Sequence, residues 1–497
     1  MADEAINQED NQTEQELTIE NVIEKVKGFA KKCGGKEVDD YVFRTNTSDD
    51  AFNKGGAYFG FIEPSEQASG VYHDLSLVFF PPRDLTKKWI VSLGVGSEGF
   101  INDLELASFP GVRRLFSKLV STENGFCKTD FTDIGNSTIN RFIRNENLDE
   151  SLKKSLKKYQ DVLQVGELVD INQDKKLKVF ERYVAAYAKL RDWASNNNHR
   201  SDINKSIGLL GTVNVNEEAE IEHLEHLLEN RKYVVLQGPP GTGKTRMAKK
   251  VAKKMNASVK FIQFHAETSY SDFIYGIRPN VKSDNLNYTE KKGIFVEAIE
   301  EAQNAIKEAQ NKKVKEYKKV VLIIDEINRA NLSNVLGPIF YLFEYQMDES
   351  NIKIEITPIE IEITPNLKLT KLPENLYVIA TMNTADRSLA VLDFALRRRF
   401  AWYDVKPKRI KLNDKIFYDG DFERFASIFE WYANSNELAL QPGHAYFIAD
   451  DEAKMKNRIR YELYPLIKEY LNEGLLTKAK EEFNQYFLER IQMSLFE

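Results

Sequence analysis

The sequence has few cysteines, no long apolar run and no excess of positive charge. Only Cys33 and Cys127 occur in 497 residues, and they lack the spacing of a metal-ligand pair. So few cysteines exclude a disulfide framework and fit a reducing compartment. No apolar run approaches the roughly 20 residues that span a bilayer, and the acidic start MADEAINQED lacks the apolar core of a signal peptide. We therefore expect a cytoplasmic protein with no membrane contact.

The charge balance limits the classes of partner. The formal net charge is −7, so any contact with nucleic acid must use a local basic patch. Hydrophobic residues make up 42% of the chain and charged residues 29%, which is ordinary for a globular protein. A chain of this length has room for two to four domains.

Changes in composition along the chain predict five segments. The first is acidic and has almost nothing to bury, the second has β-rich texture, and the third has helical periodicity. The predicted segments are a disordered tail (1–16), an α/β module (17–135), a helical segment (136–206), a second α/β subdomain (207–405) and a helical C-terminal subdomain (406–497).

The α/β module contains apolar runs at Ala57–Ile62, Leu75–Phe80 and Trp89–Leu93, separated by proline and glycine. These runs predict a mainly antiparallel sheet. Their aromatic residues could stack on nucleic-acid bases and so recognise a DNA target. Aromatic residues in strands are more often simply core, and we favour that interpretation.

A glycine-rich loop follows the apolar run Tyr233–Leu236 and precedes a helix-prone segment. Its residues are Gly238, Pro239, Pro240, Gly241, Thr242, Gly243, Lys244 and Thr245. Glycines let the backbone wrap a phosphate chain with its N–H groups pointing inward, and the helix start adds further donors. Lys244 would reach the β- and γ-phosphates, and the Thr245 hydroxyl would bind Mg²⁺. This pattern predicts a nucleotide-binding P-loop.

Two further strands end in polar residues suited to phosphate chemistry. The run Val320–Ile324 leads into Asp325 and Glu326. Asp325 is suited to hold Mg²⁺, directly or through water, and Glu326 to deprotonate an attacking water. A strand ending at Asn383 would place an amide beside them.

The arginines Arg397, Arg398 and Arg399 follow an apolar segment. A helix end rich in arginine is usually solvated. Here we favour a guanidinium offered to a neighbouring subunit's phosphate, which would require an oligomeric ring.

Strands alternating with helices over 207–405 predict a parallel sheet with helices on both faces. One local repeat interrupts the pattern: Ile354–Pro358 recurs as Ile361–Pro365. Apolar and polar residues alternate in both copies, on either side of a proline turn, and this pattern predicts a β-hairpin formed by the two copies.

These motifs together resemble the core of an AAA+ ATPase with its helical lid, and in detail the McrB family. The matching segments are Gly238–Thr245, Phe264–Pro279, Ile324–Asn331, Met382–Ser388, Leu396–Phe400 and Gly443–Phe447. The string Met-Asn-Thr-Ala-Asp-Arg-Ser at 382–388 is the most specific of them. The resemblance begins near Gly211 and does not extend to the first two hundred residues.

The resemblance implies a role for each matching residue. Nucleotide and Mg²⁺ would bind the P-loop and Asp325, Glu326 would be the catalytic carboxylate, and Asn383 the first sensor. Asp386 and Arg387 would respond to the partner nuclease or to the adjacent subunit. Arg398 and Arg399 are both finger candidates, and Arg458 and Arg460 are second-sensor candidates by position only.

The expected function is thus a motor subunit of a restriction or phage-defence complex. The resemblance implies a ring, as a hexamer, that hydrolyses GTP and drives DNA translocation with a separate McrC-like endonuclease. The alternative is a MoxR-like ATPase that remodels protein complexes with ATP. The intact Lys244, Asp325, Glu326 and Asn383 argue against a third class, a scaffold with a degenerate site. The sequence leaves GTP against ATP open, because base selectivity comes from loop contacts.

Overall fold

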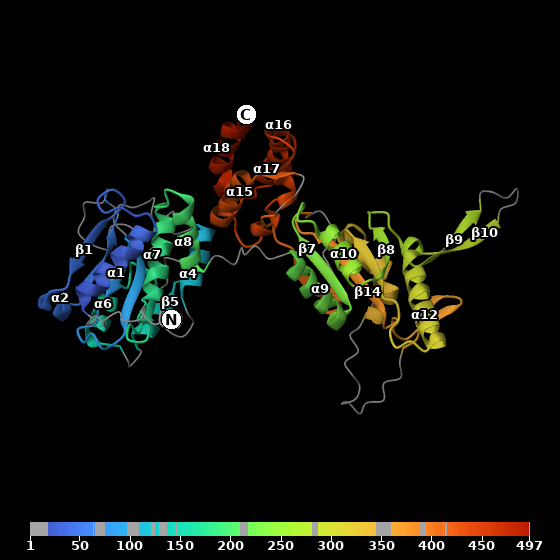
Figure 1. The fold of residues 1–497 in the computed structure, drawn as a ribbon, viewed down its shortest axis with the longest axis horizontal. Helices are drawn as coiled ribbons and strands as arrows, with labels where there is room; N and C mark the ends of the chain where they lie inside the picture. The colour runs from blue at the N-terminus through green and yellow to red at the C-terminus, as the bar shows by residue number, and fades with distance from the viewer. Residues whose placement is uncertain are drawn as a thin grey trace, which may run out of the picture. The chain divides into compact units, whose positions relative to one another are not determined.

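The computed structural model describes residues 18–62, 64, 75–96, 109–120, 125–128, 137–144, 148–208, 217–280, 287–343, 359–386, 394–410, 412 and 415–496. The chain divides into two compact units, residues 1–213 and 214–497. Both are drawn in Figure 1. The predicted acidic tail, residues 1–16, lies outside the described residues.

The N-terminal unit is built on one antiparallel sheet. In spatial order its strands are β1 (Val42–Asn46), β2 (Tyr58–Ile62), β3 (Leu75–Phe80), β4 (Trp89–Val95), β6 (Leu163–Val169) and β5 (Gly125–Cys127). Every neighbouring pair runs antiparallel. The prediction of a mainly antiparallel sheet is confirmed.

Helices cover both faces of this sheet. They are α1 (Ile19–Lys32), α2 (Asp49–Lys54), α4 (Pro110–Leu119), α5 (Ser137–Ile143), α6 (Glu150–Tyr159), α7 (Lys178–Leu190) and α8 (Asn197–Ile207). Successive strand residues point to opposite faces, so Val78 and Phe80 pack with α6 while Phe79 meets Phe180 of α7. Strands covered on both sides explain why β3, β4 and β6 are buried along their whole length.

Four of the aromatic residues that the structure describes in the strands of this unit form core. Phe59, Phe61, Phe79 and Trp89 are all 0% exposed. The Phe59 and Phe79 rings stack on each other at 5.1 Å between centroids. The alternative of a base-stacking pocket made by these four rings is therefore wrong, because the rings are buried against one another and cannot contact a base.

The segment 136–206, predicted to be helical, contains α5 to α8 but also one strand that the prediction missed. Its residues Leu163–Val169 form β6, which pairs with both β4 and β5 inside the sheet. The run Leu-Gln-Val-Gly-Glu-Leu-Val is short and flanked by helices, so its strand character was hidden among helical periodicity. The helices of this segment therefore belong to the same unit as the N-terminal sheet.

The second unit contains a five-stranded parallel sheet. Its spatial order is β15 (Ala401–Asp404), β7 (Tyr233–Gly238), β14 (Leu376–Asn383), β11 (Val320–Asp325) and β8 (Ser258–Gln263). All four neighbouring pairs are parallel. The prediction of a parallel sheet is confirmed.

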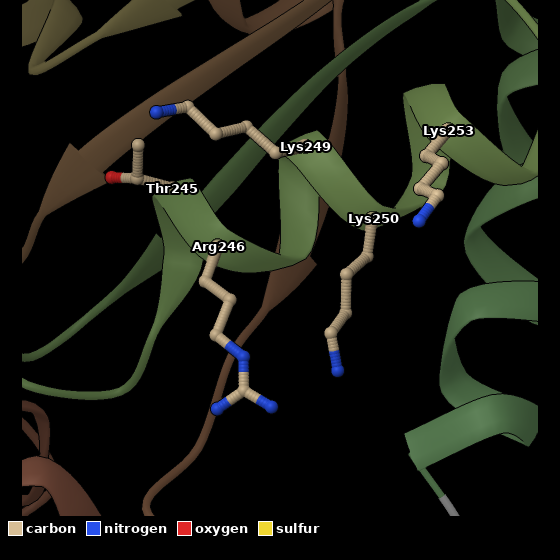
Figure 2. Close-up of a pocket in the computed structure, with 5 residues that line it drawn as sticks. All are labelled: Thr245, Arg246, Lys249, Lys250 and Lys253. Carbon is tan, nitrogen blue, oxygen red and sulfur yellow. The ribbon is translucent and has the colours of Figure 1, made fainter.

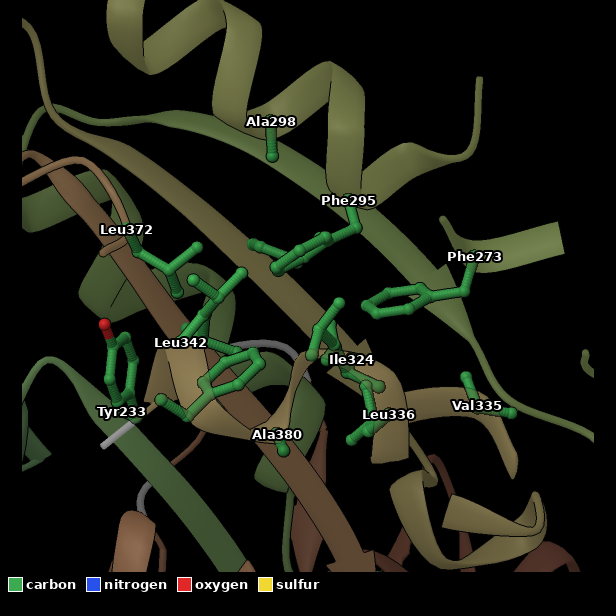
Figure 3. Close-up of a cluster of buried hydrophobic side chains, with 14 of the residues drawn as sticks. Tyr233, Phe273, Phe295, Ala298, Ile324, Val335, Leu336, Leu342, Leu372 and Ala380 are labelled. Carbon is green, nitrogen blue, oxygen red and sulfur yellow. The ribbon is translucent and has the colours of Figure 1, made fainter. Parts of the chain in front are cut away.

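Two helical layers sandwich this sheet. One contains α9 (Glu217–Arg231) and α10 (Lys244–Lys254), which bury Leu224 and Val251 against Val234 and its neighbours. The other contains α12 (Ile294–Lys312), α13 (Leu332–Leu336) and the 3-10 helix η3 (Gly337–Phe343). Figure 3 shows the second layer, with Phe295 of α12 and Leu336 of α13 facing Ile324 of β11.

Smaller elements connect these layers. They are α11 (Tyr270–Phe273), η2 (Ile327–Arg329), α14 (Phe394–Arg399) and two hairpins, β9 (Tyr275–Asn280) with β10 (Asn287–Lys292) and β12 (Ile361–Thr364) with β13 (Leu367–Leu369). The β9–β10 hairpin projects from the unit (Figure 1) and was not predicted.

The hairpin expected from the repeat is only partly testable. Its first copy, residues 354–358, lies outside the described residues. The second copy forms β12, and β12 pairs with β13 on its C-terminal side. The turn follows Thr364 directly, so the proline that closes the repeat lies in this turn.

The C-terminal helical lid has its own core. Its elements are β16 (Ile416–Phe417), α15 (Asp419–Tyr432), η5 (Glu437–Leu440), η6 (His444–Phe447), β17 (Ile448–Ala449), α16 (Glu452–Arg458), the π-helix η7 (Ile459–Leu463), α17 (Tyr464–Asn472), η8 (Thr477–Ala479) and α18 (Lys480–Ile491). Phe425, Phe447 and Phe483 centre the cluster. In the described part of the chain, no helix is both long and apolar enough to cross a membrane.

Candidate nucleotide-binding site

The P-loop connects the end of β7 to the start of α10. Gly241 and Gly243 both have φ of +79°, in the left-handed region that only glycine enters without strain. Gly243 is the N-cap of α10, so the loop passes directly into the helix start. The loop therefore has the backbone shape and the helix dipole that bind phosphate.

Lys244 and Thr242 are held inside the loop. The Lys244 ammonium donates to the carbonyl oxygens of Gly238 and Pro239, at 2.9 Å each. The Thr242 hydroxyl also donates to Pro239, at 2.9 Å. Burial lowers the pKa of Lys244, while Glu326 and Asp325 nearby oppose that shift. A buried cation beside main-chain carbonyls is suited to transfer its hydrogen bonds to phosphate oxygens.

Asp325 sits at the centre of the site. One of its carboxylate oxygens accepts from the Thr245 hydroxyl at 2.6 Å and from the Thr381 hydroxyl at 2.7 Å. A hydroxyl and a carboxylate are hard oxygen ligands of the kind Mg²⁺ prefers, and Mg²⁺ usually takes few protein ligands besides phosphate and water. This set fits the ion, whereas no cluster of three acidic, histidine or cysteine side chains occurs among the described residues.

Thr381 was missed by the sequence reasoning. It is 1% exposed, and besides bonding Asp325 its oxygen accepts from the Glu326 backbone N–H at 3.0 Å. The detectable signal was a polar residue two positions before Asn383 in a buried strand, because such residues share a face. Thr381 thus positions both carboxylates of the acidic pair.

Glu326 has the environment of a general base. Its backbone is left-handed, with φ of +54°, a conformation that costs a non-glycine residue about 1–3 kcal/mol and is common at active sites. Burial raises the pKa of its carboxyl, against the opposing charges of Arg329 and Lys244. A raised pKa makes a carboxylate a stronger proton acceptor.

Asn383 lies at the end of β14, directly opposite Gly238 of the P-loop strand. Its side-chain oxygen accepts from the Ala385 N–H at 3.1 Å, and its carbonyl accepts from the Asn328 amide at 3.3 Å. The structure therefore brings Asn383 to the same sheet edge as the loop and the acidic pair.

Arg329 is a second residue that the sequence reasoning missed. Its guanidinium bonds Asp386 at 3.1 Å and lies 3.6 Å from Glu326. Asp386 is thereby connected to the candidate base through one side chain. Arg387, which was predicted to act with Asp386, lies outside the described residues.

The candidate finger residues lie at the opposite edge of the sheet. They end α14, and the strand that follows begins at Ala401, which pairs with Val234. Val234 is four residues before Gly238, so roughly 13 Å of strand at ~3.3 Å per residue separates that point from the loop. Arg398 is exposed, whereas Arg399 is half-buried with its guanidinium 5.7 Å from the Phe340 ring. The structure does not bring these arginines to the P-loop of their own chain.

A shallow pocket of about 470 Å³ borders the loop along the outer side of α10. Figure 2 shows its lining by Thr245, Arg246, Lys249, Lys250 and Lys253. Arg246 and Lys250 pair with Glu217 of α9. The pocket is therefore a basic flank of α10 that meets the phosphate loop at Thr245.

Comparison with known proteins agrees with this geometry. A family model for an AAA domain of the dynein-related subfamily matches residues 233–400. The type IV methyl-directed restriction enzyme EcoKMcrB subunit of Escherichia coli K12 is 34% identical over 278 residues, covering 51% of this chain and 57% of that protein. The type II restriction enzyme BsuMI component YdiS of Bacillus subtilis 168 is 27% identical over 199 residues, covering 34% of this chain and 55% of that protein.

The chain thus spans little more than half the length of these relatives. One solved structure, from Cytophaga hutchinsonii, is 20% identical over 49% of this chain and 60% of that chain. Its TM-score is 0.25, which is too low to support a conclusion.

The parallel sheet, the P-loop and the acidic pair at one sheet edge define an AAA+ nucleoside triphosphatase. Within that class, the chain is similar to the EcoKMcrB subunit of Escherichia coli over about half of its length.

Proposed function

We propose that this chain is the nucleotide-hydrolysing motor subunit of a McrBC-like restriction or phage-defence complex in the cytoplasm. The observation that carries the proposal is the convergence of Thr245, Asp325 and Glu326 at one sheet edge, where Thr381 contacts both acidic residues. That edge lies within the domain that the family model matches, and two restriction-enzyme components are among the relatives.

The site residues then have distinct tasks. Thr245 and Asp325 would hold Mg²⁺, which supplies charge neutralisation on the phosphates when bound. Lys244 binds phosphate oxygens, Glu326 accepts a proton from the attacking water, and Asn383 orients that water. The substrate is GTP, by similarity to the McrB family, with ATP as the competing nucleotide.

The position of α14 favours a site shared between subunits. An arginine finger stabilises charge on the transferred phosphate and must approach it closely. The arginines lie at the far sheet edge of their own chain. A neighbouring copy of the chain would therefore supply the finger, in a ring that we take to be a hexamer by family resemblance. We assign that role to Arg398, because Arg399 is partly buried against Phe340.

The contacts of Asp386 support a route for partner control. A separate McrC-like endonuclease or an adjacent subunit that contacts Asp386 would change its pairing with Arg329, and Arg329 faces Glu326. Such a contact would release or reorient the carboxylate of Glu326, the candidate general base. Arg387 is assigned to the same contact by family resemblance. The N-terminal unit would recognise DNA, including a modified base, and hydrolysis would drive translocation.

The test compares GTP and ATP hydrolysis by the purified chain, with methylated DNA, unmethylated DNA and no DNA, and with and without its endonuclease partner. We expect GTP turnover that increases with the partner and with methylated DNA. Lys244→Ala is the matched inactive control. Turnover of ATP alone, with no response to DNA, would contradict the proposal and favour a MoxR-like remodelling ATPase.

A further inference from the structure

The lid contacts the outer side of the P-loop through the segment Gly443–Phe447. The Gly443 N–H donates to the Pro240 carbonyl and the Ala445 N–H to the Gly241 carbonyl, both at 2.9 Å. A Cβ on Gly443 would lie 2.1 Å from the Gly241 carbonyl carbon, so only glycine fits there. The loop carbonyls face the lid, which leaves the loop N–H groups for phosphate.

Arg458 holds this segment in place from the lid side. Its guanidinium donates to the carbonyls of Ala445 and Ile448, at 2.7 and 2.6 Å, and pairs with Glu462. This arginine was a second-sensor candidate by its position. Its contacts show that it fixes the lid segment that lies against the P-loop.

His444 lies at the centre of this contact. Its side chain packs over the loop, with Nε2 3.7 Å from the position that a Cβ on Gly243 would take. The residue is 6% exposed, and its Nδ1 is buried with no hydrogen-bond partner among the described residues. A buried polar atom without a hydrogen-bond partner is unfavourable, so Nδ1 of His444 is available to a partner that binds here.

The charged groups around His444 are engaged with one another. Lys408 pairs with Glu220, and Arg246 pairs with Glu217. Burial and the positive charges of Lys408 and Arg246 lower the pKa of His444 to about 4. The imidazole is therefore neutral at pH 7, and it is suited to an uncharged hydrogen-bonding group more than to a phosphate.

We propose that His444 Nδ1 forms a hydrogen bond with the nucleoside part of the bound nucleotide, so that a lid residue takes part in substrate recognition. The inference rests on the proposed nucleotide-hydrolysing function. The phosphates occupy the N–H side of the loop, and the nucleoside must leave the loop past Gly243 and the start of α10. His444 lies at that point: its Nε2 faces Gly243, and Nδ1 of the same ring is buried with no hydrogen-bond partner among the described residues.

The experiment measures binding of GDP, ADP, 7-deaza-GDP and inorganic tripolyphosphate to the full chain and to His444→Ala. We expect the Kd of GDP and ADP to rise about tenfold, as for loss of one hydrogen bond, while the Kd of tripolyphosphate changes less than twofold. His226→Ala, an exposed histidine of α9, is the matched control and should change neither. His444→Gln should recover part of the lost affinity.

The outcomes distinguish a direct hydrogen bond from His444 to the nucleoside from an indirect effect of His444 on the shape of the P-loop. If 7-deaza-GDP loses no affinity in His444→Ala, the bond is to the base N7; if it loses as much as GDP, the bond is to another nucleoside atom. Equal losses for tripolyphosphate and GDP would overturn the proposal, because His444 would then only shape the loop. Unchanged GDP affinity would overturn it as well. Failure of the unaltered chain to bind any nucleotide would instead contradict the proposed function.

Discussion

The two sheets of this protein distribute their polar residues in opposite ways. In the parallel sheet all strands end at one edge, so Gly238, Asp325 and Asn383 meet there although about 145 positions separate the first from the last. In the antiparallel sheet the strand ends alternate between two edges. A parallel sheet thus concentrates its chemistry at strand ends, whereas the antiparallel sheet presents no such shared edge.

The comparison also explains what each sheet does with large side chains. The N-terminal sheet packs stacked aromatics on a face covered by α7, and those rings have no exposure. In the parallel sheet, the inner strand β11 is aliphatic along its buried length and ends in Asp325. The first unit is therefore informative about stability and the second about catalysis, and substitutions in the two should have different effects.

The largest expected effect is at the acidic pair. Glu326→Gln should lower kcat at least about 100-fold, because the amide cannot accept a proton from water. Nucleotide affinity should be retained, since Lys244, Thr245 and Asp325 are unaltered. Steady-state hydrolysis and equilibrium binding test both statements, with exposed Glu316→Gln as control. Undiminished turnover would remove Glu326 from its assigned role.

The second prediction concerns the far edge of the parallel sheet. Arg398→Ala and Lys244→Ala should each be inactive alone, but an equal mixture should regain about a quarter of the unaltered activity if each site joins two chains. The hydrolysis rate across mixing ratios measures this. Arg397→Ala, exposed on the same helix, is the control and should stay active. Absence of recovery at every ratio would argue against shared sites.

A pair of identical substitutions tests the contrast between the units. Phe79→Ala and Phe429→Ala each remove a fully buried ring, and each should destabilise its own unit by about 3–5 kcal/mol. Only Phe429→Ala, in the lid core, should lower DNA-independent hydrolysis. Thermal unfolding and turnover below the first transition separate the two effects. If Phe79→Ala also loses basal turnover, the units do not act independently.

The smallest effect is in the pH profile. The carboxylate of Glu326 is the active form and burial raises its pKa above 4.5, so kcat should fall on the acid side with a midpoint above 4.5. The effect of Glu326 on the free energy of unfolding has the opposite pH dependence to that of a salt-bridged acid. The folded state binds the Glu326 proton more tightly than the unfolded state, so the stabilisation from this proton is lost as pH rises through the folded-state pKa. A midpoint at or below 4.5, with circular dichroism unchanged, would contradict the assignment.

Much of the second unit could be predicted from the sequence. In this unit the functional motifs directly follow predicted strands. Because parallel strands end at the same sheet edge, the sequence alone predicts that Thr245, Asp325 and Glu326 lie close together. Arg329 could not be found this way, because its role depends on a left-handed turn at Glu326. Thr381 carried a signal, its position two residues before Asn383, but its bond to Asp325 depends on the order of the strands. The lid contact of Gly443 depends on a fold-back of about 200 residues, which no local pattern contains.

The N-terminal unit was less predictable for a physical reason. Its strand β6 lies between helices α6 and α7 and pairs with strands that precede it in the chain. Its seven residues include glutamine, glycine and glutamate, so neither alternation nor an apolar run marked it. The buried charge of Glu167, which breaks the apolar pattern, is paired with Arg182 at 2.6 Å, a contact that the sequence does not reveal.

The glycine contact between lid and P-loop has a consequence for biosynthesis. On the ribosome, residues 238–245 emerge some two hundred residues before Gly443 and Ala445, which donate hydrogen bonds to the loop. Phe447 is anchored by Phe425 of α15, and Phe425 in turn packs on Phe483 and Tyr486 of α18. The nascent chain would therefore carry a loop without its outer support until α18 has been translated, and nucleotide binding should mature only after synthesis of this unit is almost finished.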